Sequence, residues 1–113
     1  MKYEIKLNMG FDKVYSYIKN NFKNISKSVT IENESKIERN NLKISFLTYE
    51  RYSYFGGNRV SLTVLVVGDE CLTEVQMVTS GGSRAVFFKM NTVGEERFLN
   101  LAIKCLNELD GRS

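Results

Sequence analysis

The spacing of apolar residues changes along the chain, and each change predicts a new kind of element. Over residues 2–9 the apolar side chains occupy alternate positions and predict a half-buried strand: Tyr3, Ile5, Leu7 and Met9. They then recur at helical spacing and predict a short amphipathic helix: Phe11, Val14, Tyr15, Ile18 and Phe22. Asp12 supports this helix, because a carboxylate in the first turn complements the helix dipole.

The middle of the chain returns to alternation and predicts antiparallel hairpins. Asn40 and Asn41 suit a two-residue type I′ turn. That turn sets the register of the first hairpin: Ile37 with Ile44, Ser35 with Phe46, Asn33 with Thr48, and Ile31 with Glu50. On this register the charged residues of the first strand form a solvated outer surface: Glu32, Glu34, Lys36 and Glu38.

Two further hairpins complete the predicted meander. An odd loop length around Gly56-Gly57-Asn58 would place Phe46 and Tyr52 on the same face as Val60. Gly68-Asp69 suits a type II′ turn. That turn would set the pairs Val66 with Cys71, Val64 with Thr73, Leu62 with Val75, and Val60 with Met77.

The C-terminal third predicts a closing helix, preceded by a short strand over residues 85–90. Thr92 and Glu95 have the spacing of a capping box. An apolar stripe follows at helical spacing and ends near Gly111: Phe98, Leu99, Ala102, Leu106 and Leu109. The element order therefore predicts an α+β fold, in which a curved antiparallel sheet packs against a long C-terminal helix. We expect one domain, 1–113, because no linker or repeat interrupts the chain.

This order of strand, helix, four or five antiparallel strands and long helix resembles the helix-grip and TATA-binding-protein-like folds. In those folds the groove between sheet and terminal helix often holds an apolar ligand, so the resemblance implies a ligand-binding groove. Several strings also resemble those of a small uncharacterised bacterial family, which has no established activity: Ser61-Leu62-Thr63-Val64, Ser80-Gly81-Gly82, Phe87-Phe88 and Gly94-Glu95-Glu96.

The composition of the chain limits the classes of function that it can have. The 113 residues are 42% hydrophobic, enough for one core, and 16 basic against 13 acidic side chains give a net charge of +3 without any long run of one sign. This charge lacks the clustering of a dedicated nucleic-acid binder. No stretch is apolar for long enough to be a signal peptide or a membrane span. We expect a cytoplasmic protein.

The absence of histidine removes most familiar catalytic and metal sites. Ser-His-Asp and Cys-His nucleophile activation and every His-containing metal site are excluded. Cys71 and Cys105 lie far apart without a Cys-x-x-Cys motif, so we expect two reduced, packed thiols. The sequence therefore predicts no enzyme, no cofactor and no metal.

One candidate binding site is a polar set on the predicted inner face, beneath the closing helix: Asn33, Thr48, Glu50 and Thr73, with Tyr52 and Tyr54 adjacent. A buried carboxylate without a partner is costly, so Glu50 there would indicate a wet cavity or a cationic ligand. The alternative, which we favour, is a β-bulge near Tyr49-Glu50-Arg51 that sends Glu50 to solvent.

A second candidate is an anion-binding loop, Gly81-Gly82-Ser83-Arg84, whose backbone amides and arginine would hold an oxyanion. Ordinary turn chemistry, with glycine supplying positive φ, explains the same residues better. A third is a hairpin end rich in aromatic and basic residues that would suit single-stranded nucleic acid: Tyr49, Arg51, Tyr52, Tyr54, Phe55 and Arg59. Cross-strand aromatic packing is the simpler explanation.

Exposed rings at that hairpin, or at Phe87 and Phe88, would equally suit a homodimer surface. The leading hypothesis is therefore a non-enzymatic module of helix-grip type whose groove or outer β surface holds a small apolar ligand or a second protomer. The alternative is a nucleic-acid-associated protein that uses the Tyr/Arg hairpin.

Overall fold

The computed structural model describes residues 1–52, 59–81 and 88–111, with the backbone alone over 88–93. Its elements follow the predicted order: β1 (Lys2–Leu7), α1 (Phe11–Asn21), a short 3₁₀ helix η1 (Phe22–Asn24), β2 (Val29–Arg39), β3 (Leu42–Tyr52), β4 (Arg59–Gly68), β5 (Thr73–Gly81) and α2 (Phe88–Leu109). The α+β class is confirmed.

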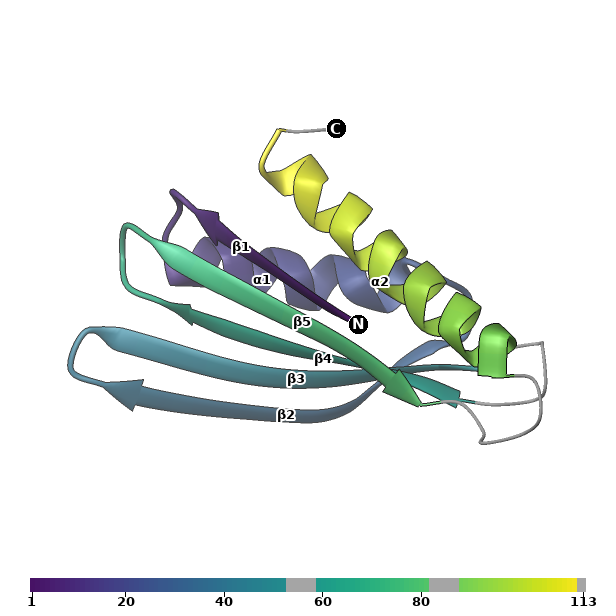
Figure 1. Cartoon of the computed structure of the whole chain (residues 1–113). Helices are drawn as coiled ribbons and strands as arrows, with labels where there is room; N and C mark the ends of the chain where they lie inside the picture. Colours follow the sequence, from purple (N-terminus) through teal and green to yellow (C-terminus); the bar gives the residue numbers. More distant parts are fainter. Residues whose placement is uncertain (53–58, 82–87, 112–113) are drawn as a thin grey trace.

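The strands form one five-stranded antiparallel sheet in the order β1-β5-β4-β3-β2. β2 to β5 are the predicted meander, and β1 returns to pair with β5, so β1 and β2 form the two edges. Both helices lie on one side of the sheet, with α2 over β5 and β4 (Figure 1). We call the helix-covered side of the sheet the inner face and the opposite side the outer face.

The core lies between the inner face and the two helices. From the sheet it takes the alternate residues that point toward the helices: Ile5, Leu7, Leu47, Tyr49, Val60, Leu62, Val64, Val66, Val75 and Met77. The predicted apolar stripes of both helices complete it: Phe11, Val14, Tyr15, Ile18 and Phe22 from the N-terminal side, and Phe98, Leu99, Ala102 and Leu106 from α2. The periodicity therefore identified both helical stripes correctly.

The predicted register of the first hairpin is right over most of its length. Ile37 pairs with Ile44, and Arg39 pairs with Leu42 across a two-residue turn. Asn40 has positive φ (55°) but Asn41 does not, which is the pattern of a type II′ rather than a type I′ turn. A bulge between Ile31 and Asn33 then shifts the register, so Ile31 faces Tyr49 instead of Glu50.

The predicted face of this hairpin is wrong. Tyr52 pairs with Arg59, so an even number of residues separates the two strands, and the alternation reverses relative to β4. Leu47 and Tyr49 are fully buried on the inner face, whereas Phe46 points outward and is 43% exposed. The expectation that Phe46 and Tyr52 share a face with Val60 fails because it assumed an odd loop.

The predicted turn after β4 is also wrong, although its faces are right. Gly68 pairs with Thr73 and Val66 with Val75, not with Cys71. The Asp69 carboxylate accepts hydrogen bonds from the amides of Cys71 (2.8 Å) and Leu72 (2.9 Å), which stabilises a longer turn. The observed register differs from the predicted one by an even number of residues, so the same alternate residues of β5 still face the core.

α2 begins earlier than predicted. Its backbone is already helical at Phe88, which contradicts a strand over 88–90, and residues 85–87 lie outside the described part of the chain. Thr92 and Glu95 therefore lie within the helix and not at its N-terminus. The helix ends at Leu109, as predicted, and Gly111 follows with positive φ (75°).

Adjacent residues of β3 provide a test of the two faces. We expect Leu47→Ala to lower the free energy of unfolding by about 2–5 kcal/mol, because it leaves a cavity in the core. Phe46→Ala should cost only about 1 kcal/mol, because roughly half of its ring is already in water. Urea unfolding measures both free energies, at protein concentrations low enough that the unfolding midpoint does not change with protein concentration. An equal or larger loss for Phe46→Ala would contradict the face assignment.

Candidate functional site

The outer face of the sheet carries a cluster of apolar residues that no described element covers. We call this cluster the outer patch and define it by residues of four strands: Ile37, Leu42, Ile44, Phe46, Leu65, Val67 and Val78. Strand register makes it continuous, because Ile37, Ile44 and Val67 form one row across the sheet and Phe46 lies beside Leu65 in the next row. Val78 lies one row further on, across from Thr63 and diagonal to Leu65, at the margin of this surface.

Its members are more exposed than is usual for large apolar side chains. Ile37 is 50% exposed and Val78 41%, and Leu65 and Val67 are half-buried only by their neighbours in the sheet. Charged pairs border it, Lys2 with Glu4 (2.7 Å) on the edge strand β1 and Glu50 with Arg59 (2.9 Å) toward the far end of β3. An apolar centre with a polar rim is the usual layout of a protein interface.

The predicted polar set is not brought together beneath α2. Thr48 and Glu50 lie on the outer face, and Asn33 and Tyr52 are exposed there. Only Thr73 lies on the inner face, where it is buried and its hydroxyl donates to the carbonyl of Met9 (2.8 Å). Tyr54 lies outside the described residues.

Glu50 reaches the outer face, as the favoured alternative predicted, but for another reason. The bulge lies in β2, and β3 itself runs without one at residues 49–51. Every side chain of β3 points to the face opposite to the one expected. Glu50 forms an ion pair with Arg59 on that face. Glu50 is therefore a rim residue of the outer face.

The other two candidate sites are only partly described. Gly81 ends β5 with positive φ (115°), and a side chain there would approach the carbonyl oxygen of Arg59 to 2.8 Å, so the backbone requires glycine. Gly82, Ser83 and Arg84 lie outside the described residues. The aromatic and basic hairpin end is divided between faces, with Tyr49 and Arg51 inside and Tyr52 and Arg59 outside.

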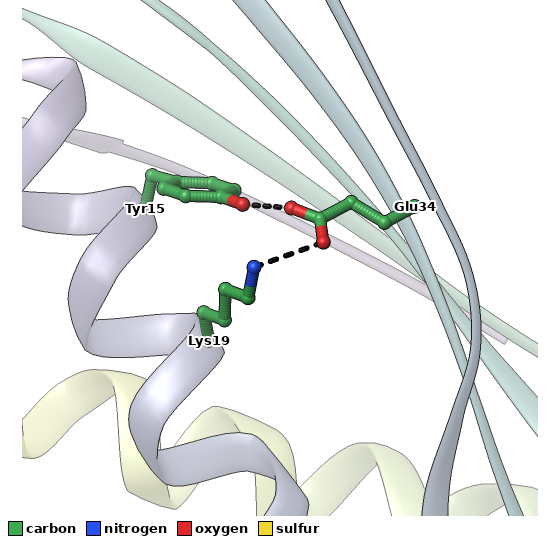
Figure 2. Close-up of polar contacts among 3 residues, drawn as sticks. All are labelled: Tyr15, Lys19 and Glu34. Carbon is green, nitrogen blue, oxygen red and sulfur yellow. Dashed lines mark hydrogen bonds and ion pairs between the residues drawn. The ribbon is translucent and has the colours of Figure 1, made fainter.

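The helix side of β2 carries a polar cluster, so the predicted position of Glu34 and Lys36 on the solvated outer surface is wrong. Figure 2 shows Tyr15 and Lys19 of α1 approaching the two carboxylate oxygens of Glu34. The Tyr15 hydroxyl donates to one oxygen and the Lys19 ammonium to the other at 3.0 Å. Lys36 lies over the Tyr15 ring, 4.2 Å from its centre. Both Glu34 oxygens are engaged, so the cluster ties α1 to the edge strand.

A tyrosine hydroxyl near this cluster is left without a partner. Tyr49 is fully buried, and its hydroxyl has no hydrogen-bond partner among the described residues. Burial, reinforced by the negative charge of Glu34, raises the pKa of Tyr49 to about 12. The Tyr17 hydroxyl, by contrast, donates to the carbonyl of Cys105 (2.7 Å) and links α1 to α2.

The cysteines only partly match the expectation of packed thiols. Both are free, but Cys71 is exposed in the turn after β4, while Cys105 is partly buried and burial raises the pKa of its thiol. Across the described ranges no three acidic or cysteine side chains are arranged to hold a metal ion. None of the helices described there has the length and apolarity needed to span a membrane.

The chain belongs to a family of unknown function, DUF6054, whose model matches residues 1–110. No curated protein and no solved structure matches the chain.

Two tyrosines with opposite hydrogen bonding should respond differently to loss of the hydroxyl. We expect Tyr15→Phe to lower the free energy of unfolding by about 1–2 kcal/mol, because Glu34 loses a donor at a partly buried position. Tyr49→Phe should be neutral or stabilising, since the hydroxyl it removes is buried without a partner. Urea unfolding near neutral pH compares them. A loss at Tyr49 as large as that at Tyr15 would contradict this assignment.

The raised pKa of Tyr49 predicts a specific alkaline response. A tyrosine in the unfolded chain ionises near pH 10, whereas folded Tyr49 resists until about pH 12. Ionisation of this group therefore leaves the free energy of unfolding unchanged below pH 10 and lowers it by roughly 2–3 kcal/mol as the pH rises toward 12. Tyr49→Phe should lose less stability over that interval than the wild type. Parallel pH profiles for the two proteins would refute the prediction.

Proposed function

We propose that this member of DUF6054 is a non-enzymatic interaction module of helix-grip type that forms a homodimer through the outer patch. The carrying observation is that an apolar patch on the outer face of the sheet is left uncovered by the described residues, on the side opposite the helices. Contiguous exposed apolar surface of this kind marks interaction sites in soluble proteins. The absence of histidine and the full engagement of Glu34 support a non-enzymatic role.

The sequence of β4 supports coverage of both faces of the sheet. Val64 and Val66 point into the core, and the alternate residues Leu65 and Val67 point outward into the patch. The outward residues in the first half of β4 are polar, Arg59, Ser61 and Thr63, so only the second half of the strand is apolar on both sides, a pattern typical of a segment buried on both sides. Inside one copy β4 is covered only on its inner face, so a second layer on the outer face would complete the pattern.

The size of the outer face fits a protein partner. Four strands of about ten residues and the six-residue β1, about 4.8 Å apart, span roughly 700 Å², using ordinary strand spacings. That is about the area each partner contributes to a standard protein interface. Two such sheets can stack face to face about 10 Å apart, as in a β-sandwich.

The charge around the patch favours a second copy. Along β1 the outer side alternates Lys2, Glu4 and Lys6, and Glu74 lies beside Lys6 on β5. A rim of mixed sign can be brought into register with itself by a twofold axis, because each lysine can meet a glutamate of the other copy. A rim of one sign would instead repel its copy.

Phe46→Lys tests this dimer directly. We expect sedimentation equilibrium to show that the wild type is a dimer. In the variant the dissociation constant of the dimer should rise at least about thirtyfold, which corresponds to the loss of an interface residue that contributes about 2 kcal/mol. Circular dichroism should remain native, because Phe46 is not part of the core. Leu72→Lys is the matched control, since Leu72 is 47% exposed but lies in the turn after β4.

Two results would overturn the proposal. One is a wild-type chain that stays monomeric at millimolar concentration. The other is a dimer whose dissociation constant responds equally to Phe46→Lys and Leu72→Lys, because such a dimer would use another surface.

A further inference from the structure

The solvent side of α1 carries a stripe of lysines, on the opposite side of the molecule from the outer patch (Figure 1). The apolar side of the same helix is buried in the core, so α1 has one apolar side and one basic side. We call the basic side the lysine stripe and define it by exposed residues at helical spacing, together with the next lysine along the chain: Lys13, Ser16, Asn20, Lys23 and Lys27.

The segment that carries the stripe holds the positive excess of the chain. Of the 16 basic side chains, four lie within residues 13–31, where there is no aspartate or glutamate, and the other 12 stand against 13 acidic side chains elsewhere. The lysines are four to six residues apart in the sequence, so they form no unbroken run of charge. Helical spacing gathers them on one side of the molecule instead.

The carboxylates that flank the stripe are engaged by other residues. Asp12, in the first turn of α1, is paired with Lys43 at 3.0 Å. Glu34, on β2, accepts from the Lys19 ammonium at 3.0 Å and from the Tyr15 hydroxyl. Neither carboxylate is therefore left to neutralise the stripe.

Three lysines of the stripe are free to meet an anion. Lys13, Lys23 and Lys27 are exposed and form no ion pair within the described part of the chain. Lys27 follows Lys23 by four residues and so lies within about 14 Å of it. Several charges of one sign on one surface raise the local concentration of an oppositely charged partner, and the effect is strongest for a polyanion.

We propose that the lysine stripe binds the phosphate backbone of a nucleic-acid duplex without reading its sequence. Lys13 and Lys23 are about 15 Å apart along the helix axis, and a duplex presents one negative charge for about every 1.7 Å of its own axis. Ser16 and Asn20 lie between the two lysines and carry the hydroxyl and amide donors that proteins commonly use toward phosphates. This surface is distinct from the outer patch, so the proposal does not rest on the dimer.

Two other polyanions fit this surface less well. An amphipathic helix binds a membrane by inserting its apolar side into the lipid, whereas Val14 and Ile18 of α1 are fully buried in the core. Proteins that bind a single strand stack aromatic rings on its bases. Tyr15 is buried and Tyr17 is half-buried beside α2, so neither ring is presented at the stripe.

The test is a titration of a labelled DNA duplex of about 20 base pairs with the full chain, followed by fluorescence anisotropy. We expect saturable binding at about 20 mM salt that weakens about 500-fold by about 200 mM, because three phosphate contacts give a slope of roughly −2.7 in the logarithm of affinity against that of salt. Changing Lys13, Lys23 and Lys27 together to glutamine should weaken binding at about 20 mM salt at least about tenfold and bring the slope toward zero. Circular dichroism and the dimer should be unaffected, because the three side chains are exposed and lie away from the outer patch.

The matched control changes Lys2, Lys6 and Arg39 together to glutamine. These residues are exposed on strands of the sheet, and either triple variant lowers the formal net charge from +3 to 0. The control should bind the duplex like the wild type, and sedimentation of the same samples separates a change in the dimer from a change in duplex binding.

Three results would overturn the proposal. One is the absence of binding at about 20 mM salt, where the phosphate contribution is largest. Another is an equal loss of affinity in the two triple variants, because net charge and not the stripe would then be responsible. The third is tighter binding to single-stranded oligothymidylate or to phosphatidylserine vesicles than to the duplex.

Discussion

The packing of one sheet face against two helices determines where nearly every other side chain lies. Side chains alternate along a strand, so burying Leu47 and Val64 beneath the helices necessarily turns their neighbours Phe46 and Leu65 to the other side. Both α-helices in the described part of the chain, α1 and α2, lie on the inner face. The described part of the chain thus builds one apolar sheet face that the helices cover and, on the opposite face, an apolar patch that they do not cover.

The elements could be predicted because their periodicity is local, whereas their facing could not. β1, α1 and the apolar stripe of α2 each contain a single consistent pattern. β3 has apolar residues at both alternate sets of positions, Ile44 and Phe46 on one side and Leu47 and Tyr49 on the other. Which of the two sets faces the helices depends on whether the connection to β4 has an odd or an even number of residues, and composition does not reveal that number.

The turn after β4 and the polar cluster around Glu34 were also not predictable from local periodicity. Asp69 captures two amides with its carboxylate and so lengthens a turn that its Gly-Asp sequence suggests should be tight. The sequence predicts a solvated Glu34, because charged residues on a strand usually face solvent. The available signal was on α1, where Tyr15 and Lys19 lie one turn apart and can reach the same carboxylate.

The edges of the sheet bear on how copies of the chain can associate. β2 is long, but it carries a bulge between Ile31 and Asn33 and charged residues along its length, features that discourage edge-to-edge pairing. β1 is short and alternates lysine with glutamate on its outer side. Association through edges would also leave one edge free on every copy and permit continued growth. A twofold contact between outer patches uses the same surface on both copies, so it closes at two. Of the two modes, the face-to-face contact is therefore the one that buries the apolar surface and leaves none of that surface free for a third copy.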